Sequence, residues 1–233
     1  MASTTEKRKK ILVTGAAGDV GYVVVKGLQD RYAMRGFDRR PMPDLDEAVV
    51  ADLADTEALS DAVDGVDAII HLAAIPTGAA PWDDILERNI VGTYNVLENA
   101  RHHGVKRVAY ASRAGLLAPY PEDVMRTHDL PVRPRSYYSV SKAFGENLGY
   151  MYSDQFDLEV VCVRIGNLQK DRPEPSHPHH LGHQDCASVF DQAISWPGVT
   201  FEVVFGVSGS HEPMYDLEHG RQAIGYYPVQ GFA

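Results

Sequence analysis

The sequence predicts an α/β fold built on a doubly wound parallel sheet, and three observations support this prediction. Short runs rich in β-branched residues alternate with amphipathic stretches, which is the pattern of βαβ units. A glycine-rich turn follows the first of these runs and opens a helical stretch. The 233 residues are few for two domains but enough for one with a buried core, so we expect a single domain over residues 1–233.

The predicted strands follow one another along most of the chain. Right-handed crossovers between them give a Rossmann-like sheet of about seven strands. The stretch 171–183, dense in proline and histidine, follows the sixth strand and should form a loop at the carboxyl edge of the sheet, where such folds bind ligands. We therefore expect the substrate to meet this loop. The strands are predicted at residues 11–14, 32–37, 48–51, 68–74, 107–112, 159–164 and 201–205.

Composition and charge exclude several kinds of partner. Asp and Glu number 32 against 22 Lys and Arg, so the net charge of −10 offers no basic field for nucleic acid or anionic membranes. Cys162 and Cys186 have no CxxC spacing and are too few for a disulfide framework. The apolar run at 11–13 is far shorter than a signal-peptide core or a membrane span. These features predict a cytoplasmic protein.

The glycine-rich turn has the spacing of a dinucleotide-binding site. Gly15 permits a tight turn, Gly18 lets the backbone approach a pyrophosphate, and Gly21 lets helix and strand pack closely. The N–H groups at the start of the following helix would face the anion. We expect residues 1–167 to form this NAD-binding part and residues 168–233 a small substrate-binding and closing segment.

The end of the second predicted strand bears on the choice of cofactor. Asp38 stands where an acidic side chain accepts hydrogen bonds from the adenosine ribose and repels a 2′-phosphate, which favours NAD. Arg39 and Arg40 follow it, and an arginine here can hold the 2′-phosphate of NADP. The two arginines can equally belong to a solvated loop. NAD is the predicted cofactor, with NADP as the less favoured alternative.

A second motif carries acid–base chemistry. Tyr138 and Lys142 lie four residues apart in a predicted helix that begins near Ser136, so they share one face. A neighbouring ammonium stabilises a phenolate and lowers the pKa of the tyrosine from its usual value of ~10. Tyr137 lies on a different face of the helix. Tyr138 is therefore the predicted proton donor and acceptor.

These motifs together resemble the extended short-chain dehydrogenase/reductases, of the NAD-dependent epimerase/dehydratase superfamily. The matching runs are TGxxGxxG at 14–21, HLAA at 71–74, NIVGT at 89–93 and YSVSKAFGE at 138–146. Residues 138–147, Tyr152 and 163–168 look most like the uronate dehydrogenases and the haloarchaeal enzymes that oxidise glucose 6-phosphate. The likeness covers nearly the whole chain and implies an oxidoreductase of carbohydrate metabolism.

The resemblance also implies roles for particular residues. Tyr138 would be the acid/base, Lys142 would hold the nicotinamide ribose and lower the pKa of the tyrosine, and Asn89 would support the lysine through a water. Asp38 would bind the ribose, and 72–76 would line the dinucleotide. The further positions expected to contact the cofactor are Gly15, Gly18, Asp19, Val20, Gly21, Arg39, Asp52, Leu53, Leu72, Ala73, Ala74 and Ile165.

The chain departs from the family where the fifth strand ends. A Ser-Ser-Asn-His run is usual there, but residues 112–115 read Ser-Arg-Ala-Gly. Arg113 takes the place of the second, catalytic serine, which leaves Ser112 as the candidate serine. Because alternate side chains on a strand face opposite ways, Ser112 is not a simple replacement. The positions that correspond to substrate contacts are Pro76, Arg113, Ala114, Gly115, Asn167 and Ser176.

Two hypotheses describe Arg113. Its guanidinium can face the pocket and bind a carboxylate or phosphate of the substrate in bidentate fashion. Alternatively, it points away and pairs with an acidic surface residue. Loss of the serine would slow the reaction without abolishing it, since removing one such donor often costs a factor of about 10² to 10³ in turnover.

The histidines of the 171–183 stretch allow three interpretations. They can bind a metal, contact the substrate or form a solvated polar loop. Their spacing has no fixed helical or hairpin geometry, and hydride transfer to a nicotinamide needs no metal, so no metal site is expected. The four residues are His177, His179, His180 and His183.

Three functions remain open on the sequence. The first is NAD-dependent oxidation of a hydroxyl on a small sugar or sugar acid. The second is a nucleotide-sugar epimerase or dehydratase, which the short C-terminal region disfavours. The third is a non-catalytic NAD-binding regulator, suggested by Arg113. Apolar residues of the tyrosine helix, including Phe144, Leu148 and Met151, allow a homodimer or higher homo-oligomer, although core packing explains them equally well.

Overall fold

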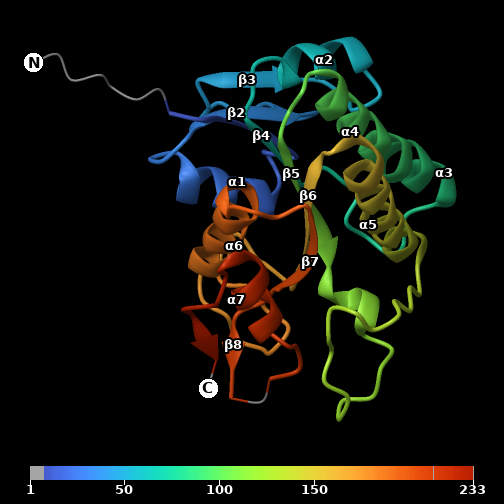
Figure 1. Ribbon diagram of the computed structural model, residues 1–233, viewed down its shortest axis with the longest axis vertical. Helices are drawn as coiled ribbons and strands as arrows, with labels where there is room; N and C mark the ends of the chain where they lie inside the picture. Colours follow the sequence, from blue (N-terminus) through green and yellow to red (C-terminus); the bar gives the residue numbers. More distant parts are fainter. Residues whose placement is uncertain (1–7, 212, 233) are drawn as a thin grey trace, which may run out of the picture.

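Seven parallel strands form one sheet in the order β3-β2-β1-β4-β5-β6-β7 (Figure 1). The computed structural model describes residues 8–211 and 213–232. The strand order reverses between β1 and β4, and this switch point is where doubly wound sheets bind ligands. The strands are β1 (Lys10–Thr14), β2 (Ala33–Asp38), β3 (Glu47–Val50), β4 (Ala68–His71), β5 (Arg107–Arg113), β6 (Glu159–Ile165) and β7 (Phe201–Gly206).

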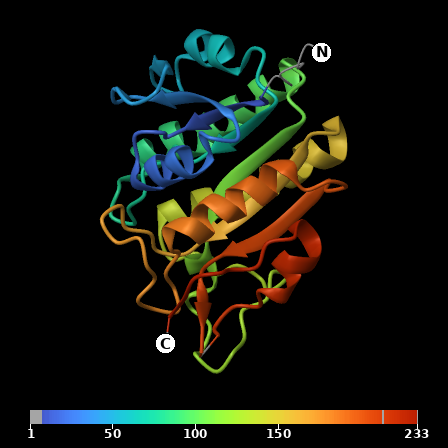
Figure 2. The ribbon, with the colours of Figure 1, turned by 90° about the vertical axis from the view of Figure 1, so that its left-hand side faces the viewer.

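Helices cover both faces of the sheet (Figures 1 and 2). On one face, α1 (Asp19–Leu28) and α6 (His183–Ser195) pack their apolar residues against the strands. On the other face lie α2 (Thr56–Val63), α4 (Gly92–His102) and α5 (Tyr137–Phe156). The shorter elements are α3 (Trp82–Ile85), the π-helical η1 (Leu86–Val91), the 3-10 helix η2 (Ala114–Leu117), α7 (Glu218–Ile224) and the strand pair β8 (Gly209–Ser210) and β9 (Gly231–Phe232).

The predicted fold class is confirmed, with small differences at the strand ends. The largest concerns the strand predicted at 68–74, which ends at His71. The ladder stops there because the N–H of Ala73 points to the side-chain oxygen of Thr14, at 3.4 Å, rather than to a neighbouring strand. Among the described residues, no helix is long and apolar enough to cross a membrane.

A smaller hydrophobic cluster lies beyond the carboxyl ends of β5 and β7. It joins Ala114 and Leu117 of η2 to Phe205, Val207 and Tyr215. Residues 168–233 therefore fall into two parts. β7 belongs to the main sheet and α6 packs against it, while the rest packs below the sheet (Figure 1). The division of the chain at residue 167 stays a prediction.

A buried histidine joins three elements at the switch point. The hydroxyl of Thr93 donates to the carbonyl of Asn89 at 2.6 Å, so it accepts from Nε2–H of His71 at 3.1 Å. Nδ1 of His71 then accepts from the hydroxyl of Thr14 at 2.7 Å. Burial, aided by the charge of Lys142, lowers the pKa of His71 to about 3. The ring is therefore neutral in the folded protein, with one fixed tautomer.

This histidine should make folding stability depend on pH. In the unfolded chain His71 takes up a proton near its ordinary pKa of 6.5, whereas the folded protein resists protonation down to about 3. Its contribution to stability is thus complete above pH 6.5 and is lost as the pH falls from 6.5 towards 3. In His71→Gln, the fall in unfolding free energy over that interval should be shallower by up to ~1.4 kcal/mol per pH unit.

Urea denaturation of both proteins at several pH values between 4 and 8 measures this slope. His102→Gln is the matched control, since His102 is an exposed histidine whose Nε2 lies within hydrogen-bond distance of Glu98 and Arg101. Equal slopes for the parent protein and His71→Gln would contradict the assignment of a neutral buried ring.

Candidate functional site

The glycine-rich turn folds as close packing requires. Gly15 has a φ of 76°, and a Cβ there would lie 2.7 Å from the backbone nitrogen of Ala73. A Cβ on Gly21 would lie 2.3 Å from the carbonyl oxygen of Gly15. Gly18 caps α1 without any side-chain hydrogen bond, so the first N–H groups of the helix stay available to an anion. The turn therefore has the shape and polarity that a pyrophosphate needs.

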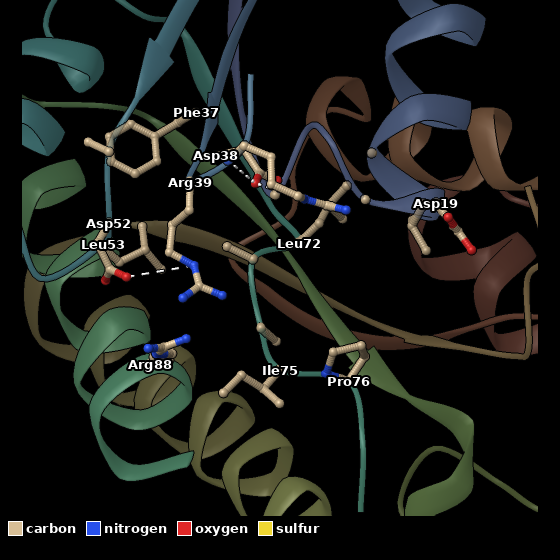
Figure 3. Close-up of a pocket in the computed structure, with 18 of the residues that line it drawn as sticks. Asp19, Phe37, Asp38, Arg39, Asp52, Leu53, Leu72, Ile75, Pro76 and Arg88 are labelled. Carbon is tan, nitrogen blue, oxygen red and sulfur yellow. Dashed lines mark hydrogen bonds and ion pairs between the residues drawn. The ribbon is translucent and has the colours of Figure 1, made fainter. Parts of the chain in front are cut away.

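A cavity of about 690 Å³ opens beside this turn, at the carboxyl ends of β1, β2 and β4 (Figure 3). Its volume is within the range of small-molecule and cofactor pockets. The predicted residues that line it are Gly15, Gly18, Asp19, Val20, Gly21, Asp38, Arg39, Asp52, Leu53, Leu72, Ala73, Ala74, Ile75 and Pro76. Phe37, Arg40, Ala51, Arg88 and Leu168 complete the lining, and the predicted cofactor contacts Asn89, Tyr138, Lys142 and Ile165 lie outside it.

Asp38 fixes the turn to the end of β2. One carboxylate oxygen accepts from the backbone N–H of Ala17 at 3.1 Å, and the other accepts from that of Arg40 at 2.9 Å. A carboxylate has further lone pairs, which remain for ribose hydroxyls. Arg39 turns across the cavity, where its Nε lies 3.7 Å from an oxygen of Asp52 (Figure 3).

Arg88 is a cavity residue that the sequence reasoning did not find. Its Nε is buried and has no hydrogen-bond partner within the described part of the chain. It lies four residues before Gly92, where an added Cβ would contact Leu53 at 2.9 Å, so one helical face carries both residues. That four-residue spacing is the signal by which Arg88 could have been found. A donor without a partner beside Leu53 suits a ligand that brings its own acceptor atoms, as an adenosine does (Figure 3).

Tyr138 and Lys142 share a face of α5, as predicted. The helix begins after Ser136, whose hydroxyl accepts from the N–H of Ser139 at 3.1 Å. Nζ of the buried Lys142 donates to the carbonyl of Ala111 in β5 at 2.7 Å and lies 5.8 Å from the centre of the Tyr138 ring. Backbone contacts of this kind hold the pair at the end of β5.

The charges around this pair differ from the prediction. Burial, together with the charge of Arg113, lowers the pKa of Lys142 to about 7. Burial raises the pKa of Tyr138, and the opposing effect comes from Arg113. The predicted lowering of the tyrosine pKa by Lys142 is therefore not seen, because the lysine itself tends to lose its proton beside a permanent cation.

Asn89 connects the cavity to α5. Its side-chain oxygen accepts from the N–H of Ile75 at 2.8 Å, and its amide donates to the carbonyl of Ile75 and to Oγ of Ser141, at 3.2 and 3.1 Å. Asn89 lies in the π-helical η1, a distortion often found at functional sites. The contact with Ser141 is one residue from Lys142. Support of the lysine through a water stays a prediction.

Ser112 does not meet the tyrosine. Its fully buried hydroxyl donates to Oε1 of Glu146 at 2.5 Å. Glu146 also accepts two hydrogen bonds from Arg164, each 2.9 Å long. This geometry speaks against Ser112 as the catalytic serine, since strand alternation turns its side chain into the buried ion pair.

Neither of the two hypotheses for Arg113 matches its position in the structure fully. Its guanidinium carbon lies 5.1 Å from the centre of the Tyr138 ring, and Nη1 donates to Oγ of Ser139 at 3.1 Å. Arg113 therefore faces α5 and the tyrosine. Within residues 8–211 and 213–232, no ion pair joins it to an acidic residue.

The remaining predicted substrate positions lie close to this end of the sheet. Ala114 and Gly115 begin η2, directly after Arg113. Ile165, which was predicted to contact the cofactor, pairs with Arg113 in the β5–β6 register. Asn167 follows β6, and its N–H donates to the carbonyl of His179. Ser176 contacts Nδ1 of His180 through its hydroxyl at 3.2 Å.

The histidine loop is organised by contacts within the protein. His177 and His179 stack with ring centres 5.0 Å apart, and Nδ1 of His179 lies 2.7 Å from the hydroxyl of Tyr215. His183 begins α6. In the described part of the chain, no three His, Cys, Asp or Glu side chains come together as metal ligands would.

Residues 11–184 match the NAD dependent epimerase/dehydratase family. The NAD-dependent glucose-6-phosphate dehydrogenase of Haloferax volcanii is 37% identical, over 96% of this chain and 94% of its own. The uronate dehydrogenase of Pseudomonas putida is 35% identical, over 97% of this chain and 85% of its own. A variant of the Agrobacterium tumefaciens uronate dehydrogenase, solved in complex with NAD, has a TM-score of 0.88 at 35% identity and covers 96% of this chain and 86% of that one. The resemblance drawn from the motifs is confirmed, and the chain belongs to the NAD dependent epimerase/dehydratase family.

Proposed function

We propose that this chain is an NAD-dependent dehydrogenase that oxidises a hydroxyl of a small sugar or sugar acid, with Tyr138 as the acid/base. The carrying observation is that Asn89 joins the glycine-lined cavity to the helix that bears Tyr138 and Lys142, since its side chain bonds Ile75 of the cavity wall and Ser141 of α5. Relatives that share 35 to 37% of the sequence are a glucose-6-phosphate dehydrogenase and a uronate dehydrogenase. An epimerase or dehydratase is not favoured beside these relatives.

The cavity residues have distinct tasks in this proposal. NAD, when bound, supplies the hydride acceptor. The N-terminus of α1 binds the pyrophosphate, Asp38 the adenosine ribose, and Arg88 the adenosine end. Leu53 and Leu72 provide apolar walls.

Residues of α5 transfer the proton of the substrate hydroxyl in this proposal. Tyr138 takes the proton from the substrate hydroxyl as the hydride leaves. Lys142, already anchored on the carbonyl of Ala111, has further N–H donors for the nicotinamide ribose. Substrate contacts are proposed at Pro76, Ala114, Gly115, Asn167 and Ser176, which are the family positions near this end of the sheet. Ser112 is left out of the machinery because Glu146 holds its hydroxyl.

Two further features of the protein stay predictions. We expect it in the cytoplasm, because both cysteines are free and buried. We expect it to form a homodimer through α4 and α5, because these helices expose apolar side chains that one sheet face leaves uncovered. Those side chains are Tyr94, Val140, Tyr150, Met151 and Phe156.

Replacing the proposed acid/base separates chemistry from binding. Tyr138→Phe should reduce kcat by at least ~10²-fold, since general acid–base catalysis is worth that much, while NAD still binds. The measurements are reduced-cofactor absorbance with a panel of hexuronates, aldoses and sugar phosphates, and NAD titration by calorimetry. Tyr137→Phe is the matched control, because Tyr137 is exposed and packs on Trp82 instead. Unchanged turnover in Tyr138→Phe would place the acid elsewhere.

Replacing Asp38 tests the choice of cofactor. Asp38→Ala should weaken NAD binding about tenfold or more and should favour NADP relatively, because the repulsion of a 2′-phosphate is lost. Titration of both proteins with NAD and NADP measures the ratio of dissociation constants. Asp52→Ala controls for a change of charge at the same cavity. A parent protein that prefers NADP would refute the role given to Asp38.

A further inference from the structure

The side chain of Arg113 occupies a space that a glycine leaves open. A Cβ on Gly115 would lie 2.4 Å from Nη2 and 2.7 Å from Nε of Arg113. The guanidinium is thus folded back over the backbone of residue 115, between η2 and the first turn of α5. The arginine and the glycine that makes room for it therefore form one structural unit.

Arg113 has no acidic partner in the part of the chain that the structure describes. The start of a helix carries a partial positive charge, so a guanidinium beside the first turn of α5 is electrostatically unfavourable. No carboxylate of the described residues offsets it, and its hydrogen-bond partner is the neutral hydroxyl of Ser139. The favourable contact that remains is with the face of the Tyr138 ring, at 5.1 Å.

We propose that Arg113 is a positioning residue that holds a permanent positive charge over Tyr138 and so keeps its phenol ready to give up a proton. This inference rests on the proposed function, in which Tyr138 is the acid/base. Arg113 takes over the electrostatic task expected of Lys142, which leaves the lysine to bind the ribose. An arginine suits this task because it keeps its charge at every pH at which the protein is folded.

Other charged and titratable groups around Tyr138 do not provide this charge. Lys142, on α5 itself, is buried, and burial together with the charge of Arg113 lowers its pKa to about 7, so its charge is less permanent than that of an arginine. Tyr110, on β5, is neutral, because burial raises its pKa well above 10. The charged residues of α3 and η1, which pack against α5, do not alter the pKa of Tyr138. These residues are Asp83, Asp84, Glu87 and Arg88.

The pH profile of the reaction tests this proposal. Removing the cation should raise the pKa of the phenol, so the lower limb of kcat/KM for sugar oxidation should move upward by about one pH unit in Arg113→Gln. Arg113→Lys keeps a charge and should move the limb less. A limb that stays in place in both variants, with melting temperatures like that of the parent protein, would overturn the proposal.

The same profiles separate this role from substrate binding. If Arg113 instead binds an anionic group of the substrate, Arg113→Gln raises KM for uronates and sugar phosphates but not for neutral aldoses, and the limb does not move. That outcome overturns the proposal. A shift of the limb that is equal for charged and neutral sugars excludes the substrate contact, and a titration of the tyrosines then distinguishes Tyr138 from Lys142, whose pKa Arg113 also lowers.

A titration without turnover keeps this test independent of the proposed function. Tyrosinate absorbance at alkaline pH is compared between the parent protein and Arg113→Gln, and again between the two in a Tyr138→Phe background. The second comparison measures the contribution of Tyr215, whose pKa Arg113 also lowers. The change caused by Arg113→Gln should therefore be larger when Tyr138 is present than in the Tyr138→Phe background, and the excess belongs to Tyr138. Equal changes in the two backgrounds would overturn the proposal even in an active dehydrogenase.

Gly115→Ala gives a second variant that keeps Arg113 itself. The added methyl must push the flexible guanidinium aside, so the titration should move in the same direction as in Arg113→Gln but less far. If the tyrosine titration shifts in Arg113→Gln but not in Gly115→Ala, the position of the guanidinium over the Tyr138 ring does not matter. That result would overturn the proposed geometry.

Discussion

The buried ion pair between Glu146 and Arg164 is the contact on which the catalytic end of the molecule depends. Both side chains are almost fully buried and are joined by two hydrogen bonds, and Ser112 donates a third to Glu146. Removing one member would leave an uncompensated buried charge, at a cost of about 3–5 kcal/mol. The pair fixes the middle of α5 to β5 and β6. Lys142 and Tyr138, about one and two turns earlier, are positioned by that contact.

The nucleotide end of the site is fixed by other means. Asp38 and Asn89 each use their side chains to bind backbone groups of a loop, at Ala17 and at Ile75. Both loops border the cavity, so its walls are set by hydrogen bonds before a cofactor arrives. Such preorganisation reduces the ordering that binding requires. It also explains why a loop without regular structure can line a cofactor site with defined shape.

The fold and part of the candidate site could be predicted from the sequence because their patterns are local. The strands, the glycine turn and the Tyr138–Lys142 face each depend on the spacing of a few neighbouring residues. The partner of Ser112 was out of reach because Glu146 lies 34 residues away. The direction of Arg113 likewise depends on Ser139, on another element. Arg88 was visible only as a position on a helical face, and its buried Nε requires the folded structure.

The fit between Arg113 and Gly115 makes the two residues depend on each other. A side chain at residue 115 would take the space that the guanidinium fills, since a Cβ there would lie 2.4 Å from Nη2 of Arg113. The guanidinium in turn lies over the ring of Tyr138. A substitution at this glycine therefore reaches the proposed acid/base through Arg113, although the position belongs to a short turn after β5.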